Sequence, residues 1–270
     1  MFRFFICLLL VGCGHNVDSA LKSQSSKAPW VVISDIDDTI RLSGGDDTWV
    51  KVRYATRTNE MTFFGFNEIY RELMKNPYGT TMHYVTASAK TPVINLFKIV
   101  KRSVQNGGFP EGEFTGRPMF KDTYEYKMQE HKRIIQRFPD ARILLLGDNT
   151  SFDEKIFVDL KEKYPEREIE HLVHHVTDQP KFDFGSRSYV AAPDLALQLS
   201  NIGFLSKKSA DSILSSWLSA YEDETLREER IFPKWMNCDG FSGDWSEIGR
   251  ELPLSASLRL YQKRLQQHCP

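Results

Sequence analysis

Residues 31–40 read VVISDIDDTI, and this stretch decides the fold. The run Val-Val-Ile-Ser is followed at once by three acids, Asp35, Asp37 and Asp38. Carboxylates are costly at the end of a buried strand, and a hard divalent cation bound by oxygen ligands offsets their repulsion. Ligand sites of open α/β sheets lie at the carboxyl ends of the strands, so the stretch predicts a cation site there. A plain acidic turn after a strand is the alternative for this stretch alone.

The chain from this stretch to about residue 205 alternates apolar runs with helical patterns, which is typical of an α/β fold with a parallel sheet. The apolar runs predict strands at 30–34, 82–85, 142–147 and 169–176. Helical spacing of apolar residues predicts helices at about 69–74, 93–104, 128–138 and 156–164. We interpret residues 107–127 as a loop, either a flap that reads the substrate through Arg117 or a solvated loop.

No clear strand pattern follows residue 205. Apolar residues at helical spacing mark one amphipathic helix, and they are Ile213, Leu214, Trp217, Leu218 and Tyr221. Residues 254–267 have a second helical pattern. The sequence therefore predicts a main domain at 30–205 and a mostly helical C-terminal extension at 206–270.

The N-terminal residues form a separate segment. Arg3 precedes an apolar run that is too short to span a bilayer and ends in Leu-Val-Gly-Cys13. This pattern resembles a bacterial lipoprotein signal, which predicts a signal peptide at 1–13, a lipid on Cys13 and a flexible tether at 14–29. We expect the domain to be lipid-anchored at a membrane surface of the cell envelope, facing the periplasm or on the outer membrane. An ordinary secretory signal is the alternative.

Charge and cysteine content limit the classes of partner. The chain has 35 Lys and Arg against 36 Asp and Glu, so its charge gives no reason to expect nucleic-acid binding. Cys7 leaves with the signal peptide and Cys13 carries the lipid, which leaves Cys238 and Cys269. In an oxidising compartment these two either pair or remain free thiols, and the sequence leaves both readings open.

More polar residues follow the later strands. Thr86 comes after the second predicted strand, and Asp148 comes after the third, with Asp153 five positions further on. Because the carboxyl ends of parallel strands meet at one edge of a sheet, we expect these residues to converge with the acids of 31–40.

A lysine completes the candidate set. Lys132 precedes the third strand and is the candidate for contacting a phosphate, although it could be a surface lysine, and Lys127 is the competing candidate. Acids, a hydroxyl and a lysine are together what phosphoryl transfer needs: a nucleophile, a cation site and donors for the phosphate oxygens.

The motif DIDDT at 35–39, after an apolar strand, resembles the first signature of the haloacid dehalogenase superfamily. By the same resemblance, the superfamily's second signature corresponds to Thr86, its third to Lys132, and its fourth to Gly147-Asp148 with Asp153. More narrowly, SDIDDTI, HYVTAS, GGFPEG and LLLGDN, in this order, resemble the catalytic domain of the actin-patch-associated phosphatidate phosphatase family over roughly residues 30–200. The resemblance implies a Rossmann-like α/β fold of the haloacid dehalogenase type, with helices flanking a parallel sheet and a small or minimal cap.

Two positions depart from that family's pattern. The family usually has Ser-Pro after the second-strand serine or threonine, whereas this chain has Ala87-Ser88. Its fourth signature usually reads GDSG, whereas residues 147–150 read GDNT. Both positions lie near the phosphate and the leaving group, so the departures bear on the substrate and leave the phosphatase chemistry intact.

The resemblance also implies a mechanism. Asp35 attacks phosphorus and forms an aspartyl-phosphate, while Asp37 protonates the leaving oxygen and then deprotonates the incoming water. Mg²⁺ is held by Asp35, Asp148 and the backbone carbonyl of Asp37. Thr86 and Lys132 hold the remaining phosphate oxygens.

The other polar residues have weaker assignments. Thr39 holds the backbone of the loop, and Asp38 is either a cap or a support of the site. Asp153 supports the metal through water or orients Lys132, or it only favours a helix N-terminus. We interpret the histidines of the predicted strands as structural residues, and they are His83, His171, His174 and His175.

We therefore expect a magnesium-dependent phosphomonoester hydrolase. A phosphatidate-like lipid phosphate is the favoured substrate, because the family resemblance and the membrane tether both point to it. A soluble periplasmic phosphomonoester, such as a nucleotide or sugar phosphate, is the alternative substrate. A non-catalytic lipoprotein that uses this fold as a binding module is the alternative from another class, and the combination of Asp35, Asp37 and Asp148 speaks against it.

Overall fold

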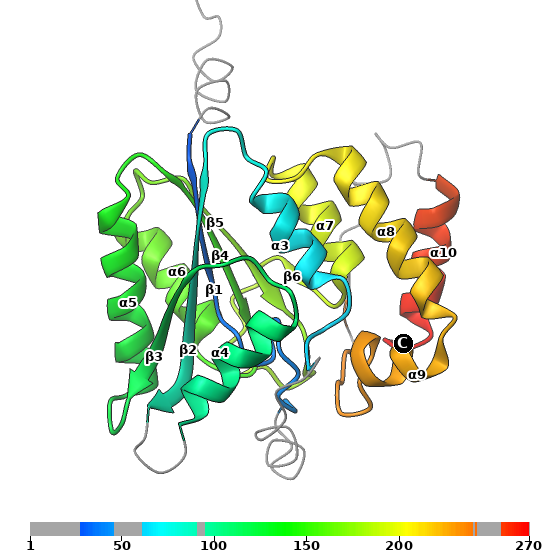
Figure 1. Cartoon of the computed structure of the whole chain (residues 1–270), viewed down its shortest axis with the longest axis horizontal. Coiled ribbons are helices and arrows are strands. Elements are labelled where there is room, and N and C mark those ends of the chain that lie inside the picture. Colours follow the sequence, from blue (N-terminus) through cyan, green and yellow to red (C-terminus); the bar gives the residue numbers. More distant parts are fainter. Residues whose placement is uncertain (1–27, 46–60, 91–94, 240, 242–254, 270) are drawn as a thin grey trace, which may run out of the picture.

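The computed structural model describes residues 28–45, 61–90, 95–239, 241 and 255–269. Its centre is a sheet of six parallel strands in the order β3-β2-β1-β4-β5-β6 (Figure 1). The strands are β1 (Trp30–Ser34), β2 (Thr80–Lys90), β3 (Glu113–Pro118), β4 (Arg142–Asp148), β5 (Ile169–His174) and β6 (Ser188–Tyr189). The predicted α/β class with a parallel sheet is confirmed.

Helices cover both faces of this sheet (Figure 1). One face carries α5 (Thr123–Arg137) and α6 (Asp153–Lys163), and the other carries α3 (Phe66–Leu73), α4 (Leu96–Asn106) and α7 (Ala192–Asn201). The two cores divide within β1: Val31 and Ile33 pack with α5 and α6, whereas Val32 packs with the helices of the opposite face. This division follows from the alternation of side chains along a strand.

The central strands bring the first and third apolar runs side by side. Every residue of β4 is buried, as expected for a parallel strand that is covered on both faces. β1 lies between β2 and β4, with Ser34 in register with Tyr84 and Leu146. The amide of Asp35 donates to the carbonyl of Leu146 at 2.8 Å, so the acids after β1 begin beside the end of β4.

Two strands were not expected from the sequence. β3 lies inside the segment 107–127 that was expected to be a loop, and β6 has two residues. β3 forms an edge of the sheet and most of its residues are only half-buried, so it lacks the continuous apolar run of the central strands. The loop prediction is therefore wrong for 113–118, and also from Thr123 onward, where α5 begins.

The C-terminal region is helical, as expected. It consists of α8 (Lys207–Tyr221), α9 (Glu224–Leu226), the π-helical turn η1 (Arg227–Ile231) and α10 (Ser255–Gln266). α8 packs along α7 and against α3, and α10 packs on α8 (Figure 1). Trp217 is buried in this layer against the rings of Tyr221, Phe232 and Tyr261. The extension thus shares one continuous core with the main domain.

A disulfide bond joins Cys238 to Cys269, which resolves the pairing that the sequence left open. The two cysteines are separated by 31 positions, and Cys269 follows the end of α10. The bond therefore ties the last helix to the segment that follows η1.

Several predictions fall outside the described residues. The signal peptide at 1–13, with Cys13, and most of the tether at 14–29 lie there. The small or minimal cap and the domain boundaries also stay predictions, because 46–60 and 91–94 are outside the described ranges. Within those ranges, each helix is too short or too polar to cross a membrane.

Candidate active site

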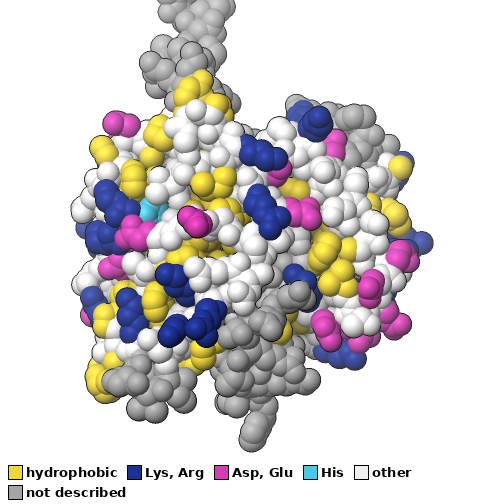
Figure 2. Space-filling model, viewed as in Figure 1, with side chains coloured by type: hydrophobic (Ala, Val, Ile, Leu, Met, Phe, Trp, Pro, Cys, Tyr) yellow, Lys and Arg dark blue, Asp and Glu magenta, His cyan; other side chains and the backbone are white. Residues whose placement is uncertain are grey.

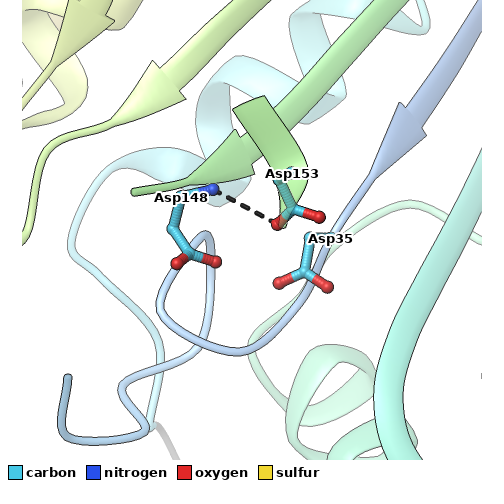
Figure 3. A group of neighbouring side chains, drawn as sticks. All are labelled: Asp35, Asp148 and Asp153. Carbon is cyan, nitrogen blue, oxygen red and sulfur yellow. Dashed lines mark hydrogen bonds between the residues drawn. The ribbon is translucent and has the colours of Figure 1, made fainter. Parts of the chain in front are cut away.

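Three buried aspartates meet at the carboxyl edge of the sheet. Asp35 follows β1, Asp148 ends β4, and Asp153 is the first residue of α6. One carboxylate oxygen from each lies within 4.8 Å of the other two, and Figure 3 shows the three side chains around a common space. Their exposed fractions are 5%, 2% and 0% in that order. The expected convergence of the β1 and β4 acids is present, and Asp153 belongs to the same group.

The lysine of this cluster is Lys127, which lies on α5. Its Nζ donates to Asp35 Oδ1 and to Asp153 Oδ1, at 2.6 Å in both cases. The placement of Lys132 at the site is wrong. Lys132 lies five residues further along α5, is only half-buried and faces Lys163, because a five-residue step turns a side chain away from the helix face that carries Lys127.

The cluster carries an unbalanced charge. Three carboxylates and one ammonium give a formal charge of minus two in a buried space. Burial raises the pKa of Asp35 well above its ordinary value; Lys127 opposes this shift and the neighbouring aspartates add to it. Burial and the charge of Asp153 raise the pKa of Asp148 to about 8. Burial alone would lower the pKa of Lys127, but the carboxylates of Asp153 and Asp35 raise it above its ordinary value.

A divalent cation fits this arrangement, because its charge would cancel the excess and its preferred ligands are carboxylate oxygens. The residues that could hold it are Asp35, Asp148 and Asp153. In the part of the chain that the structure describes, no other group of three or more His, Cys, Asp or Glu side chains is close enough to share an ion.

Asp37 lies at the edge of this cluster and contacts a different set of side chains. Arg41 Nη1 donates to Asp37 Oδ1 at 2.9 Å. The hydroxyls of Thr86 and Ser88 donate to Asp37 Oδ2 at 3.1 and 2.7 Å. The side chain of Asp37 is 27% exposed, whereas Arg41 and Thr86 are buried. Asp37 is therefore held in a fixed position and still reaches the solvent side of the site.

The loop after β1 is held from within. Asp38 has a φ of 59°, in the left-handed region, and its carboxylate accepts hydrogen bonds from the amides of residues 43–45 at 3.0 Å each. Asp38 thus acts as a cap, which is one of the two readings that the sequence left open. Thr39 Oγ1 lies 3.4 Å from oxygens of both Asp35 and Asp148, so this hydroxyl bridges the two acids.

The two departures from the family's pattern place hydroxyls on the acids. Ser88 contacts Asp37, as described above. Thr150 donates to Asp148 Oδ1 from its amide at 2.7 Å and from its hydroxyl at 2.5 Å. Both substitutions therefore supply donors that orient a carboxylate of the site.

A cavity of about 350 Å³ opens over these residues. Its polar lining includes Asp35, Asp37, Arg41, Ser88, Lys127, Asp148 and Thr150. Leu96 and Val100 of α4 form an apolar wall. The cavity thus combines charged groups at its base with an apolar side.

Arg117 does not line this cavity within the described residues. Its Nε donates to the carbonyl of Ala87 at 3.0 Å, and its Nη1 donates to the carbonyl of Lys121 at 2.6 Å. Ala87 lines the cavity, so Arg117 supports the loop that forms the rim. This geometry therefore does not favour the predicted contact of Arg117 with a substrate.

The histidines have structural surroundings, as the sequence interpretation favoured. His174 is fully buried between the carbonyls of Asp38 and Val190, at 2.7 and 2.9 Å. Burial lowers the pKa of His83, His171 and His174 to about 4 in each case. None of them belongs to the group of described side chains that could share an ion.

Sequence reasoning missed three contacts of the site: those of Arg41, Ser88 and Thr150. The first two contact Asp37, and the third contacts Asp148. Arg41 could have been noticed in the sequence, because it follows the stretch 31–40 directly. Ser88 and Thr150 stand at the two positions where the chain departs from the family's pattern, which was the signal for them, although no spacing rule gives their contacts.

The sheet and the acids after β1 and β4 agree with the arrangement of a phosphoric monoester hydrolase of the haloacid dehalogenase type. The family profile described as "Phosphatidate phosphatase APP1, catalytic domain" matches residues 30–173, just over half of the 270-residue chain. The chain belongs to this phosphatase family. A comparison with curated proteins found no match.

Proposed function

We propose that this phosphatase depends on Mg²⁺ and hydrolyses a phosphatidate-like lipid phosphate through an aspartyl-phosphate on Asp35. The observation that carries the proposal is the buried cluster of Asp35, Asp148 and Asp153 with Lys127, beneath the cavity. The family match supports the same chemistry.

Asp35 is the nucleophile in this proposal. A carboxylate oxygen of Asp35 forms a bond to phosphorus while the bond from phosphorus to the ester oxygen breaks. The ammonium of Lys127 contacts Asp35 directly and holds its orientation. The same ammonium can attract a phosphate oxygen as a point charge.

Asp37 transfers the protons. It gives a proton to the departing ester oxygen, then takes one from the water that attacks the phosphorus of the intermediate and releases Asp35. Arg41, Thr86 and Ser88 fix its carboxylate at the rim, where a leaving group has access to solvent. In this account Thr86 acts on the reaction through Asp37 as well as through the phosphate.

Asp35, Asp148 and the backbone carbonyl of Asp37 would hold Mg²⁺, with Asp153 nearby. A bound Mg²⁺ supplies charge neutralisation for the transferring phosphoryl group. Thr39 and Thr150 keep the two carboxylates in place through the hydrogen bonds described above.

The apolar wall of the cavity favours a lipid substrate over a sugar or nucleotide phosphate. Leu96 and Val100 offer contact to hydrocarbon close to the acids, and neither can form a side-chain hydrogen bond to a sugar.

A lipid anchor on Cys13, at the periplasmic side of a bacterial cell envelope, would keep the enzyme near such a substrate. The disulfide between Cys238 and Cys269 supports an oxidising compartment.

The test is phosphate release by the full chain from phosphatidate in mixed micelles and from soluble glycerol phosphate. We expect release from phosphatidate with Mg²⁺, none with a chelator, and none from Asp35→Asn. Asp159→Asn is the matched control, because Asp159 contacts Tyr124 and Lys155 outside the cavity. Faster hydrolysis of the soluble ester would overturn the lipid assignment, and full activity of Asp35→Asn would overturn the nucleophile.

A further inference from the structure

The loop between β3 and α5 exposes apolar side chains beside the cavity rim. Phe120 is 90% exposed, more than any other large hydrophobic residue in the described part of the chain, and Met119 is 42% exposed. Phe120 also has a φ of 68°, a conformation that is uncommon for a bulky residue. Arg117 ties this loop to Ala87, which lines the cavity. An exposed and strained aromatic residue beside an active site suggests a functional contact.

Basic side chains continue from this loop onto α4. Lys90 is in register with Pro118, and its Nζ lies 4.7 Å from the centre of the Phe97 ring on α4. α4 carries Lys98, Lys101 and Arg102 on adjacent turns and contains no acidic residue. Figure 2 shows Lys and Arg side chains gathered over this part of the molecule.

The cations of α4 stand outside the ion pairs that the described residues form. Among those residues, no carboxylate forms an ion pair with Lys98, Lys101 or Arg102. The whole chain has a formal charge of −1, so an overall positive charge does not account for the cations of this face. Positive charge next to exposed apolar groups is complementary to an anionic lipid surface.

We propose that this face, made of Met119, Phe120, Lys90 and the cations of α4, docks on an anionic lipid bilayer. Phe120 and Met119 enter the interface, while the ammonium groups remain at the level of the headgroups. α4 supplies both the cations and the apolar wall of the cavity, so docking places the cavity beside the lipid. Docking speeds catalysis only if the substrate is the proposed lipid, and in this respect the inference rests on the proposed function. The binding itself does not depend on turnover.

The test measures sedimentation of the full chain with vesicles, using Cys13→Ser so that no lipid anchor forms. The vesicles contain phosphatidylcholine alone or with about one-third phosphatidylglycerol. We expect stronger binding to the anionic vesicles, and a loss of binding as salt is added. Each of Lys98→Ala and Lys101→Ala should weaken binding about fivefold, because a lysine near such a surface contributes about 1 kcal/mol. Phe120→Ser should weaken vesicle binding by more than either lysine substitution does.

Two matched controls separate this face from the rest of the surface. Tyr78→Ser removes an aromatic residue that is 46% exposed. Tyr78 precedes β2 and so lies at the amino end of the strands, whereas Phe120 follows β3 at their carboxyl end. Lys161→Ala with Lys163→Ala removes two exposed lysines from the end of α6. Both controls should bind vesicles like the parent chain. Equal binding by the Phe120 and Lys98 variants and the controls would overturn the proposal.

Activity measurements separate this inference from the proposed function. The docking variants should hydrolyse dispersed short-chain phosphatidate at the parent rate and vesicle phosphatidate more slowly. Vesicle binding without any release of phosphate from phosphatidate would support docking and overturn the lipid substrate. A dimer in solution that Phe120→Ser dissociates would identify a second copy of the chain as the occupant, and would overturn docking on lipid.

Discussion

At the residue scale, Lys127 is the side chain that connects the separate parts of the site. It reaches from α5 to the acid after β1 and to the first residue of α6. Its pKa is raised by Asp153 and Asp35 despite burial, so the group stays charged throughout the physiological range. A charged group held between a nucleophile and a second acid is suited to orient the first and to attract a phosphate.

Lys127→Met should therefore lower kcat by about 100- to 1000-fold, the loss typical of a preorganised group that stabilises developing charge. Lys132→Met is the matched control and should leave kcat unchanged, since Lys132 faces Lys163 away from the cavity. Steady-state kinetics, with circular dichroism to check folding, measures both. The assignment fails if the Lys132 variant loses activity and the Lys127 variant keeps it.

Asp37 gives a second prediction at this scale. A nitrophenolate leaving group departs without taking up a proton, whereas an alkoxide leaving group needs a proton as it departs. Asp37→Asn should reduce hydrolysis of an alkyl phosphate by about 100- to 10,000-fold, and that of nitrophenyl phosphate less. The ratio of kcat/KM for the two esters measures the effect. An equal loss for both esters would show that Asp37 does not protonate the leaving group.

Some residues of the site can be assigned from the sequence and others cannot. Asp35, Asp37 and Asp148 could be assigned because each follows an apolar run and the carboxyl ends of parallel strands meet. The choice between Lys127 and Lys132 could not be made from the sequence, because both lie on one helix and only its rotation about the axis separates them. The positions of Ser88 and Thr150 could be singled out as departures from the family's pattern, but their contacts could not, because each depends on how the folded loops bring a hydroxyl onto a carboxylate.

At the scale of elements, burial decides which strands can be recognised from the sequence. β1 and β4 lie in the centre of the sheet and have continuous apolar runs, and both were predicted within a residue or two. β3 was missed because it is an edge strand, paired on one side only and mostly half-buried, so its sequence EFTGRP mixes polar and apolar residues. β3 matters for the site, because it carries Arg117, which supports the loop at the cavity rim.

The disulfide belongs to this scale, because it joins the end of α10 to the segment after η1. Reduction of Cys238–Cys269 should lower the free energy of unfolding by roughly 3 to 4 kcal/mol, as expected when a cross-link closing a loop of this length is removed. Urea unfolding of the oxidised and reduced chains measures the difference. Identical midpoints would show that the bond contributes no stability.

At the scale of the whole molecule, the buried charge links metal binding to folding. The pKa of Asp148 is raised to about 8, so without a cation the folded chain binds this proton more tightly than the unfolded chain does. Its contribution to stability is fully present below the ordinary pKa of 3.8 and is lost progressively as the pH rises from there to about 8. The pKa of His131 and of His174 is lowered to about 4 by burial, so their contribution is lost as the pH falls from 6.5 to 4.

Mg²⁺ should consequently raise Tm more at about pH 8 than at about pH 6, because at the lower pH the cation must displace bound protons. Thermal unfolding with Mg²⁺ and with a chelator measures the gain at each pH. Asp148→Asn should remove most of the gain and its pH dependence. An equal effect of Mg²⁺ on this variant and on the parent chain would show that the charge of Asp148 does not link cation binding to stability.

The central claim is that Asp35 carries the phosphoryl group during turnover, and acid quenching tests it most directly. The chain is mixed with Mg²⁺ and nitrophenyl phosphate and quenched in acid, and its peptides are weighed by mass spectrometry. We predict a phosphate on the peptide that contains Asp35, and more of it in Asp37→Asn, where the water that releases it lacks its base. Phosphate on a different residue, or turnover with an unmodified Asp35 peptide in both chains, would contradict the account.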